Sequence, residues 1–272
     1  MTMNETFGAC NLSRSIPTTT VNKQQQVNDI KMRDACMIPM NKSQVGSAGT
    51  YCDTYSSALP ASVAAQLELT DKEFDHEAVM APSTPQCSWL ISFTRALRPT
   101  RVLELGTFTG VSALAFYEAT KDTQADIISI DVSEKFLKIA QDAFIRHGAT
   151  DRIRTIQGEC LKMLTTLEGE FDLIYIDAAN DEYEDYTRFI LDHKLLSRHG
   201  VILVDDTLHE GSVVEESLLT KMKEEKHPVY VSWADPVHNF NRYAASEARV
   251  YTTLLPIFNG VTQIMWKGHN NV

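Results

Sequence analysis

Short apolar runs alternate with amphipathic segments through the middle of the chain. The runs are almost continuously apolar, which is typical of parallel strands buried on both faces of a sheet. They span residues 101–105, 126–131, 152–158, 171–177 and 200–206. Between them, apolar residues recur at helical spacing over residues 111–120, 133–148, 160–169 and 183–196. The alternation predicts an α/β fold with a doubly wound, mostly parallel sheet and helices on both faces.

The pattern changes at both ends of this region. Two helical segments, residues 60–80 and 85–99, precede the first predicted strand. Two β-like runs, 248–257 and 260–267, follow the last one and are joined through an Asn-Gly pair, which is a strong hairpin signal. We therefore expect an antiparallel hairpin to close the sheet. Residues 213–247 have a helical pattern, with an irregular stretch expected around 227–239.

Residues 1–50 are polar and rich in Ser, Thr, Gln and Asn. Such a segment buries too little apolar surface to fold by itself, so it is interpreted as a disordered tail or as an arm that packs on a second subunit. The expected organisation is an extension over residues 1–50 and one domain over residues 51–272.

Charge and cysteine usage exclude several classes of protein. The net charge is −11, while residues 1–50 carry five Lys or Arg against three Asp or Glu, so the acidity belongs to the domain. An acidic domain repels phosphate backbones, and we expect no nucleic-acid partner. Five dispersed cysteines without a CxxC pair favour reduced thiols in the cytoplasm. No apolar run approaches the ~20 residues of a membrane span, so no membrane partner is expected.

The loop after the first predicted strand reads LELGTFTG over residues 103–110. Gly106 and Gly110 let the backbone approach a ligand at this end of the sheet. A dinucleotide loop needs three glycines in GxGxxG, whereas only two are present, and the carboxylate of Glu104 would repel a pyrophosphate. Asp131, at the end of the second strand, suits a ribose diol. The combination favours S-adenosylmethionine over NAD(P), although Glu104 and Asp131 could also serve only to cap strands.

Acidic residues end the fourth and fifth predicted strands. Asp177 ends FDLIYID, and Asp205 with Asp206 ends GVILVDD. The carboxyl ends of parallel strands meet at one edge of a sheet, so these side chains should lie together. Adjacent carboxylates repel one another unless a cation or a proton intervenes. Carboxylate oxygens suit a hard divalent cation such as Mg²⁺, and the alternative is that Asp206 caps the following turn.

Several segments together resemble a known family. The motifs RVLELGTFTGVSALAF, IDVSEKFLKIAQDAF, FDLIYIDA and GVILVDDTLHEGSVV are similar to successive motifs of the cation-dependent O-methyltransferases, the family of caffeoyl-CoA and catechol O-methyltransferases. The resemblance covers roughly residues 50–267. It implies a Rossmann-like class I methyltransferase with a seven-stranded sheet, a homodimer, S-adenosylmethionine as donor and a hydroxyl of a small aromatic molecule or natural product as acceptor.

The resemblance also implies roles for individual residues. A divalent cation would be held by Asp177, Asp205 and Asp206. The cofactor would be bound by Met80, Glu104, Gly106, Ser112, Asp131, Cys160 and Asp177. Pro82 stands where a small hydroxyl residue is common in the family, and Trp233 is the best candidate among the tryptophans for lining the acceptor pocket.

One departure from the family bears on catalysis. Asn180 stands where many members have a lysine that acts as general base, and a neutral amide cannot take a proton. Either the cation alone acidifies the acceptor, or His209 replaces the base, or the chain has lost turnover and is a cofactor-binding, regulatory homologue. A lone loop histidine is more often exposed to solvent than catalytic. Methylation of nitrogen or carbon on the same fold also stays open.

Overall fold

The structure is a computed structural model that describes residues 42–215, 219–220, 223–224 and 228–268. The chain divides after Pro39, and the described residues all belong to the unit Met40–Val272. Most of the expected N-terminal extension therefore lies outside the described residues. Helix α1, Lys42–Thr54, runs across the expected boundary at residue 50.

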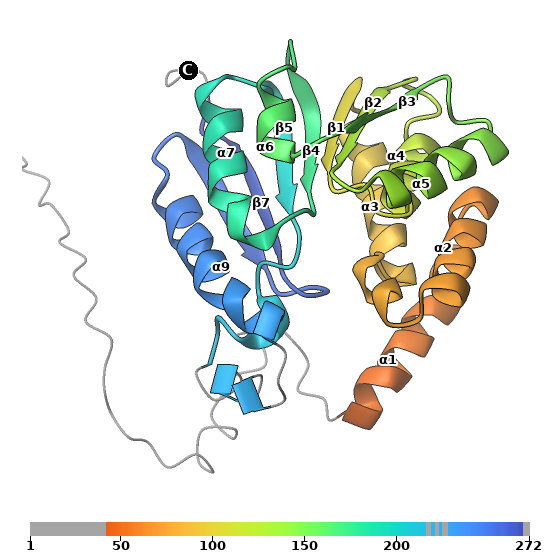
Figure 1. The fold of residues 1–272 in the computed structure, drawn as a ribbon, viewed down its shortest axis with the longest axis horizontal. Helices are drawn as coiled ribbons and strands as arrows, with labels where there is room; N and C mark the ends of the chain where they lie inside the picture. The colour runs from red at the N-terminus through yellow and green to blue at the C-terminus, as the bar shows by residue number, and fades with distance from the viewer. Residues whose placement is uncertain (1–41, 216–218, 221–222, 225–227, 269–272) are drawn as a thin grey trace, which may run out of the picture. The chain divides into compact units, whose positions relative to one another are not determined.

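The described residues form a seven-stranded sheet in the order β3-β2-β1-β4-β5-β7-β6 (Figure 1). The strands are β1 (Arg101–Leu105), β2 (Asp126–Asp131), β3 (Ile153–Gln157), β4 (Phe171–Ile176), β5 (Leu196–Val204), β6 (Val250–Leu255) and β7 (Val261–Trp266). β1 to β5 pair in parallel, while β7 is antiparallel to both β5 and β6. The predicted α/β fold with a closing hairpin is confirmed.

Helices cover both faces of the sheet, as Figure 1 shows, and each face has its own apolar core. One core includes residues of α2 (Ala61–Phe74), α3 (Thr84–Leu97), α4 (Val111–Ala119) and α5 (Glu134–Arg146). The other includes residues of α6 (Cys160–Leu164), α7 (Tyr183–Asp192) and α9 (Pro228–Ser246). The described residues also include the short 3₁₀ helices η3 (Asp75–Met80), η4 (Asn180–Glu182) and η5 (His209–Gly211), of which η4 and η5 follow β4 and β5 in the chain.

The prediction of an irregular stretch around residues 227–239 is wrong for the described part of that stretch, which belongs to α9. Pro236 lies inside this helix and costs it a backbone hydrogen bond. The cost is offset because Val237, Phe240 and Ala244 lie at helical spacing and are buried. Tertiary burial therefore outweighs the local signal of the proline.

Helix α6 is shorter than predicted and ends at Leu164 rather than near residue 169. The hydroxyls of Thr165 and Thr166 donate to the backbone carbonyls of Lys162 and Met163, each at 2.7 Å. Such local bonds compete with the helical ladder. The two threonines therefore end the helix early.

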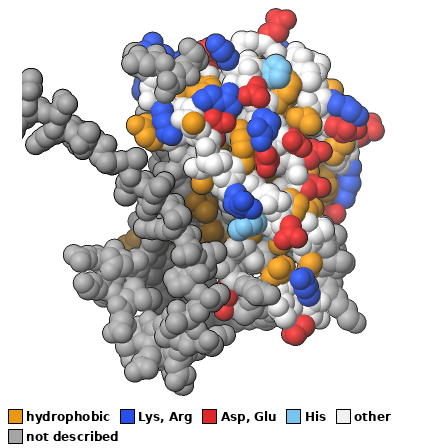
Figure 2. Space-filling view, turned by 90° about the vertical axis from the view of Figure 1, so that its left-hand side faces the viewer, with side chains coloured by type: hydrophobic (Ala, Val, Ile, Leu, Met, Phe, Trp, Pro, Cys, Tyr) orange, Lys and Arg blue, Asp and Glu red, His pale blue; other side chains and the backbone are white. Residues whose placement is uncertain are grey.

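On the face shown in Figure 2, Lys and Arg side chains are interspersed with Asp and Glu rather than gathered by sign over the described residues. None of the described helices is both long enough and apolar enough to cross a membrane.

Candidate active site

The sheet order reverses between β1 and β4, and open α/β sheets bind ligands at the carboxyl ends of strands next to such a reversal. Backbone hydrogen bonds continue past the strand ends at this point. The amide of Asp177 donates to the carbonyl of Leu105 at 2.8 Å, and the amide of Asp205 donates to that of Ile176 at 2.9 Å. Asp177 and Asp205 are thus neighbours across two paired strands, as their positions in the sequence predict.

Gly106 brings the loop after β1 against the end of β4. Its φ is +97°, and a Cβ at this position would lie 1.8 Å from the carbonyl oxygen of Asp177. A side chain there would therefore force the two strand ends apart. Glycine at this position therefore lets the donor loop pack directly against the backbone of Asp177.

Glu104 is fully buried under this loop. One carboxylate oxygen accepts a hydrogen bond from Ser129, and the other, Oε1, has no partner among the described residues. Burial raises the pKa of Glu104 to about 7, and the nearby hydroxyls of Ser112 and Ser129 oppose this shift. An unpaired buried carboxylate oxygen is costly, and it suits a ligand that brings a cationic donor.

Asp131, predicted to bind ribose, first holds the loop in place. Its Oδ2 accepts from the amides of Thr107 at 3.0 Å and Phe108 at 2.8 Å, and its Oδ1 accepts from the amide of Ser133 at 2.8 Å. Oδ1 accepts one of these bonds and can take a second, so a ribose hydroxyl can still bind. Asp131 therefore combines the strand-capping role with the predicted one.

Two further residues predicted to bind the cofactor, Cys160 and Met80, differ in their exposure to solvent. Cys160 is buried at the start of α6, and burial raises the pKa of its thiol to about 12, so it remains a neutral, apolar wall. Met80, at the end of η3, is 48% exposed and is not packed into a closed pocket.

Tyr175 connects the carboxylates at the ends of β4 and β5. Its hydroxyl donates to Asp205 Oδ2 at 2.5 Å and lies 3.4 Å from Asp177 Oδ2. Gln86, from α3, also donates to Asp205 Oδ2, and the amide of Asp206 donates to Asp205 Oδ1 at 2.9 Å. Asp205 is therefore held in one orientation by β4, by α3 and by the backbone of the residue that follows it.

The acids raise one another's pKa. Burial, followed by the charges of Asp205, Asp206 and Glu104, raises the pKa of Asp177 well above its usual range. Burial and the charge of Asp206 raise the pKa of Asp205 to about 6. A concentration of buried negative charge of this kind favours a bound cation.

The predicted set of three metal ligands is not assembled. Among the described residues, no three His, Cys, Asp or Glu side chains are placed to hold one ion. Asp206 has a left-handed φ of +56°, and its carboxylate interacts with Asn259 and His209 instead. Mg²⁺ is often bound through one or two carboxylates with water and substrate oxygens, so the pair Asp177 and Asp205 still fits it.

The two predicted catalytic residues border the acids. Asn180 opens η4 and is 7% exposed, while His209 opens η5 and is 2% exposed, so the expectation of a solvent-facing histidine is wrong. The ring of His209 lies 6.4 Å from that of Trp233 in an edge-on arrangement, and Trp233 belongs to α9. The structure thus brings a buried imidazole next to Asp206.

The sequence analysis missed Gln86 and Tyr175. Tyr175 had a usable signal, because residues two apart on a strand share a face and Asp177 follows it by two. Gln86 had none, because its partner lies 119 residues away in the chain.

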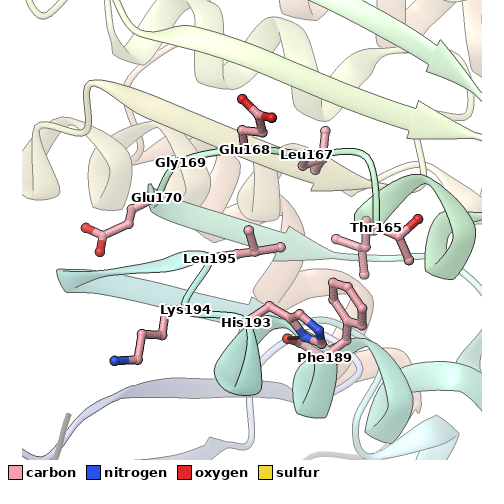
Figure 3. A pocket seen from close by; sticks show the side chains of 10 residues that line it. Thr165, Leu167, Glu168, Gly169, Glu170, Phe189, His193, Lys194 and Leu195 are labelled. Atoms are coloured by element: carbon pink, nitrogen blue, oxygen red, sulfur yellow. Dashed lines mark hydrogen bonds between the residues drawn. The ribbon is translucent and has the colours of Figure 1, made fainter.

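A separate cavity of about 330 Å³ lies at the opposite, amino-terminal ends of β4 and β5 (Figure 3). Phe189 and His193 of the α7 region stack on each other there, with ring centroids 3.8 Å apart. None of the predicted site residues lines it. It plays no part in the site described above.

The fold and this site define a class I methyltransferase. Residues 54–267 match the family described as O-methyltransferase. O-methyltransferase hkm8 of Aspergillus hancockii is 56% identical over 87% of this chain and 100% of its own length. O-methyltransferase ankF of Aspergillus thermomutatus is 34% identical over 85% of this chain and 97% of its own. The chain therefore belongs to the O-methyltransferase family.

Comparison with solved structures gives the same assignment. The SAH-bound methyltransferase PaMTH1 of Podospora anserina superposes with a TM-score of 0.82 at 35% identity, covering 85% of this chain and 99% of that one. TomG of Streptomyces achromogenes, solved in complex with SAM, shares the fold with a TM-score of 0.71 at 22% identity, covering 85% of this chain and 100% of that one. The predicted enzyme class, an S-adenosylmethionine-dependent O-methyltransferase, is confirmed, and NAD(P) is set aside as the cofactor.

Proposed function

We propose that this protein transfers the methyl group of S-adenosylmethionine to a hydroxyl of a small aromatic molecule, such as a secondary metabolite, with a divalent cation such as Mg²⁺ bound beside the donor. The proposal includes a cytoplasmic homodimer. The metal and the acceptor that we propose go beyond the family assignment. They are argued from the arrangement of the acidic side chains.

One observation carries the proposal, which is that Asp177 belongs to both halves of the site. Its backbone carbonyl lies against Gly106 in the donor loop. Its carboxylate shares the Tyr175 hydroxyl with Asp205. A donor bound along the loop and a cation bound by the carboxylates would therefore be immediate neighbours.

The donor half offers complementary groups. The unpaired Oε1 of Glu104 suits the ammonium of the methionyl end, with Ser112 next to it. Asp131 suits the ribose diol, and the neutral thiol of Cys160 suits an apolar ring. Negative charge around the sulfonium tolerates the positive charge of the donor.

In the acceptor half, Asp177 and Asp205 would hold the cation. When bound, a divalent cation acts as a Lewis acid that lowers the pKa of a coordinated hydroxyl. Tyr175 and Gln86 fix the Asp205 carboxylate, so little ordering remains to be done on binding. Alignment of the acceptor oxygen with the methyl group supplies much of the rate enhancement, since effective molarities of order 10⁵ M are attainable.

The acceptor proton needs a destination. Asn180 cannot take it, because an amide is not basic at neutral pH. His209 is buried, belongs to the same loop as Asp206 and lies beside Trp233. We propose His209 as the proton acceptor and Trp233 as one wall of the aromatic pocket.

Calorimetry with S-adenosylhomocysteine and Mn²⁺, together with methyl transfer to catechol in the presence and absence of chelator, tests the function. We expect binding of both ligands, an O-methylated product by mass spectrometry, and loss of product on chelation. Asp177→Asn should weaken Mn²⁺ binding by about 10–100-fold, because it removes a charged ligand. Asp181→Asn, at an exposed neighbour, should change neither affinity.

Cofactor binding without methylation of any hydroxylated acceptor would contradict the proposal and favour the regulatory homologue. Full activity in chelator would contradict only the role of the metal. Product on nitrogen or carbon would retain the family and change the acceptor class.

A further inference from the structure

Helix α2 has no part in the reaction outlined above, although three of its residues contact the donor loop, residues 106–110. They are Gln66, Thr70 and Phe74. Gln66 and Thr70 are polar and completely buried. Burial of polar side chains is costly unless they are hydrogen-bonded, so their place against a ligand-binding loop needs an explanation.

The backbone of the donor loop is strained. Phe108 has a left-handed φ of +44°, which is unfavourable for any residue with a side chain. Gly106 and Gly110, on either side, have φ values of +97° and +86°. Such a backbone persists only where the surrounding structure holds it. Asp131 holds the first half of the loop by accepting hydrogen bonds from two of its amides, so the second half depends on other residues.

The second half of the loop is held by α2 through Thr109, which is also completely buried. The side-chain amide of Gln66 donates to the carbonyl of Thr109 at 2.8 Å. The hydroxyls of Thr70 and Thr109 lie 2.8 Å apart. Thr70 donates its single hydroxyl proton to the carbonyl of Gln66 at 2.8 Å, so Thr109 is the donor between the two hydroxyls. Helix α2 therefore binds both the carbonyl and the hydroxyl of Thr109.

Helix α5 supports the same contacts. Arg146 donates to Oε1 of Gln66 at 3.3 Å, which fixes the orientation of the Gln66 amide with its nitrogen towards the loop. The ring of Phe108 packs edge-on against Phe74 of α2 and Phe136 of α5, with centroids 6.0 and 4.6 Å apart. The strained part of the loop is thus held by polar and apolar contacts from two helices.

We propose that Gln66 and Thr70 are positioning residues for S-adenosylmethionine, which hold the donor loop in its ligand-binding conformation before the cofactor arrives. They act through Thr109. A loop that is already ordered loses little conformational entropy when a ligand binds, and the ligand is therefore bound more tightly. The inference rests on S-adenosylmethionine as the donor and does not depend on the metal or the acceptor proposed above.

A role only in folding is the competing explanation. In that case the hydrogen bonds of Gln66 and Thr70 would stabilise the folded chain, and their loss would lower only the melting temperature. The cofactor affinity of the protein that remains folded would stay the same. Affinity measured well below the melting temperature therefore separates the two roles.

The test compares Thr70→Val, Thr70→Ser and Gln66→Leu with the unchanged full-length protein and with Thr120→Val. Thr120 is a matched control, because it is buried and its hydroxyl donates to the carbonyl four residues earlier, that of Phe116, at 2.7 Å. It caps α4 at the end opposite to Gly110 and the donor loop. The measurements are the melting temperature, the Kd of S-adenosylhomocysteine by calorimetry, and hydrogen exchange of the donor loop by mass spectrometry.

Thr70→Val and Gln66→Leu should each raise the Kd of S-adenosylhomocysteine by about 10-fold, because each leaves a buried polar group of Thr109 unpaired and releases the loop. Hydrogen exchange over residues 106–110 should become faster in both. Thr70→Ser keeps the hydroxyl and should restore both properties. Thr120→Val should lower the melting temperature and leave the Kd and the exchange of the donor loop unchanged.

The proposal is overturned if Thr70→Val and Gln66→Leu bind S-adenosylhomocysteine as the unchanged protein does, whatever happens to their melting temperatures. It is also overturned if Thr120→Val raises the Kd to the same extent, or if the unchanged protein does not bind S-adenosylhomocysteine. An unchanged protein that binds this ligand and methylates no hydroxyl would contradict the proposed function alone, because the binding comparison does not depend on turnover.

Discussion

At the scale of single residues, the donor site is built around a carboxylate that the protein leaves half satisfied. Glu104 is excluded from water, and one of its oxygens is unpaired among the described residues. This arrangement is unfavourable for the isolated protein and favourable for a complex with a cationic ligand. The free energy given up in the apo state is recovered when the ligand binds.

A pH dependence of cofactor binding follows from this residue. With a pKa of about 7, Glu104 is mostly neutral at pH 6 and mostly ionised at pH 8. Because the ionised form attracts the methionyl ammonium, the Kd of S-adenosylhomocysteine should be about tenfold higher at pH 6 than at pH 8. Calorimetry at the two pH values measures this.

The Glu104→Gln variant should bind S-adenosylhomocysteine weakly, and its Kd should change little between pH 6 and pH 8. Glu170→Gln, at an exposed carboxylate, should retain the dependence of the unchanged protein. A Kd that does not vary with pH in the unchanged protein would show that Glu104 does not contact the ammonium.

At the scale of elements, α9 is anchored to the sheet by a charged corner where it meets β6. Arg249 donates through Nε and one terminal nitrogen to Glu247, both at 2.9 Å, and through the other to Asp192 at 2.8 Å at the end of α7. The side chain of Glu247 is 12% exposed. These bonds join α7, α9 and β6, and thereby fix the helix that carries Trp233 and Phe240.

Glu247→Gln should lower the free energy of unfolding at pH 7 by about 1–3 kcal/mol, the range for hydrogen bonds to charged groups. The hydrogen bonds from Arg249 lower the pKa of Glu247 to about 2 from 4.5. The unfolded state therefore binds the proton first, and the contribution is lost as pH falls from about 4.5 towards 2. Urea unfolding measures this: the free energy of unfolding of Glu247→Gln should differ from that of the unchanged protein by a large amount at pH 7 and by a small amount at pH 3.

Glu168→Gln, at an exposed carboxylate, is the control, and its free energy of unfolding should be close to that of the unchanged protein at both pH values. An equal loss of stability at both pH values would assign the effect of Glu247→Gln to packing rather than to the ion pair.

At the scale of the whole molecule, the proposed homodimer has a candidate surface on α1. Tyr51 lies on α1 and Tyr55 directly follows its last residue; they are 65% and 74% exposed, and their rings lie 4.5 Å apart. Paired exposed aromatic residues are typical of an interface. Light scattering should give twice the chain mass of 30.5 kDa.

The double substitution Tyr51→Glu with Tyr55→Glu should halve the mass by placing charge in an apolar contact. The affinity for S-adenosylhomocysteine should be unchanged, because α1 contributes no residue to the site described here. A monomeric unchanged protein at micromolar concentration would contradict the dimer.

The sequence by itself determined the alternation of strands and helices, the closing hairpin, the donor loop and the positions of the acids. These features are local, because strand periodicity, glycine spacing and a carboxylate at a strand end are all visible within a few residues. The family motifs are local in the same sense. They placed Gly106, Asp177 and Asp205 correctly at one edge of the sheet.

Only the tertiary structure decided how those residues are held and which of them act together. Gln86 reaches Asp205 across 119 residues of chain, and no local pattern encodes that contact. The burial of Val237 and Phe240 made Pro236 acceptable within a helix. The carboxylate of Asp206 interacts with Asn259 and His209, and no group of three metal ligands forms among the described residues. Burial, hydrogen-bond partners and pKa depend on packing between distant segments, and for that reason they appear only once the chain is folded.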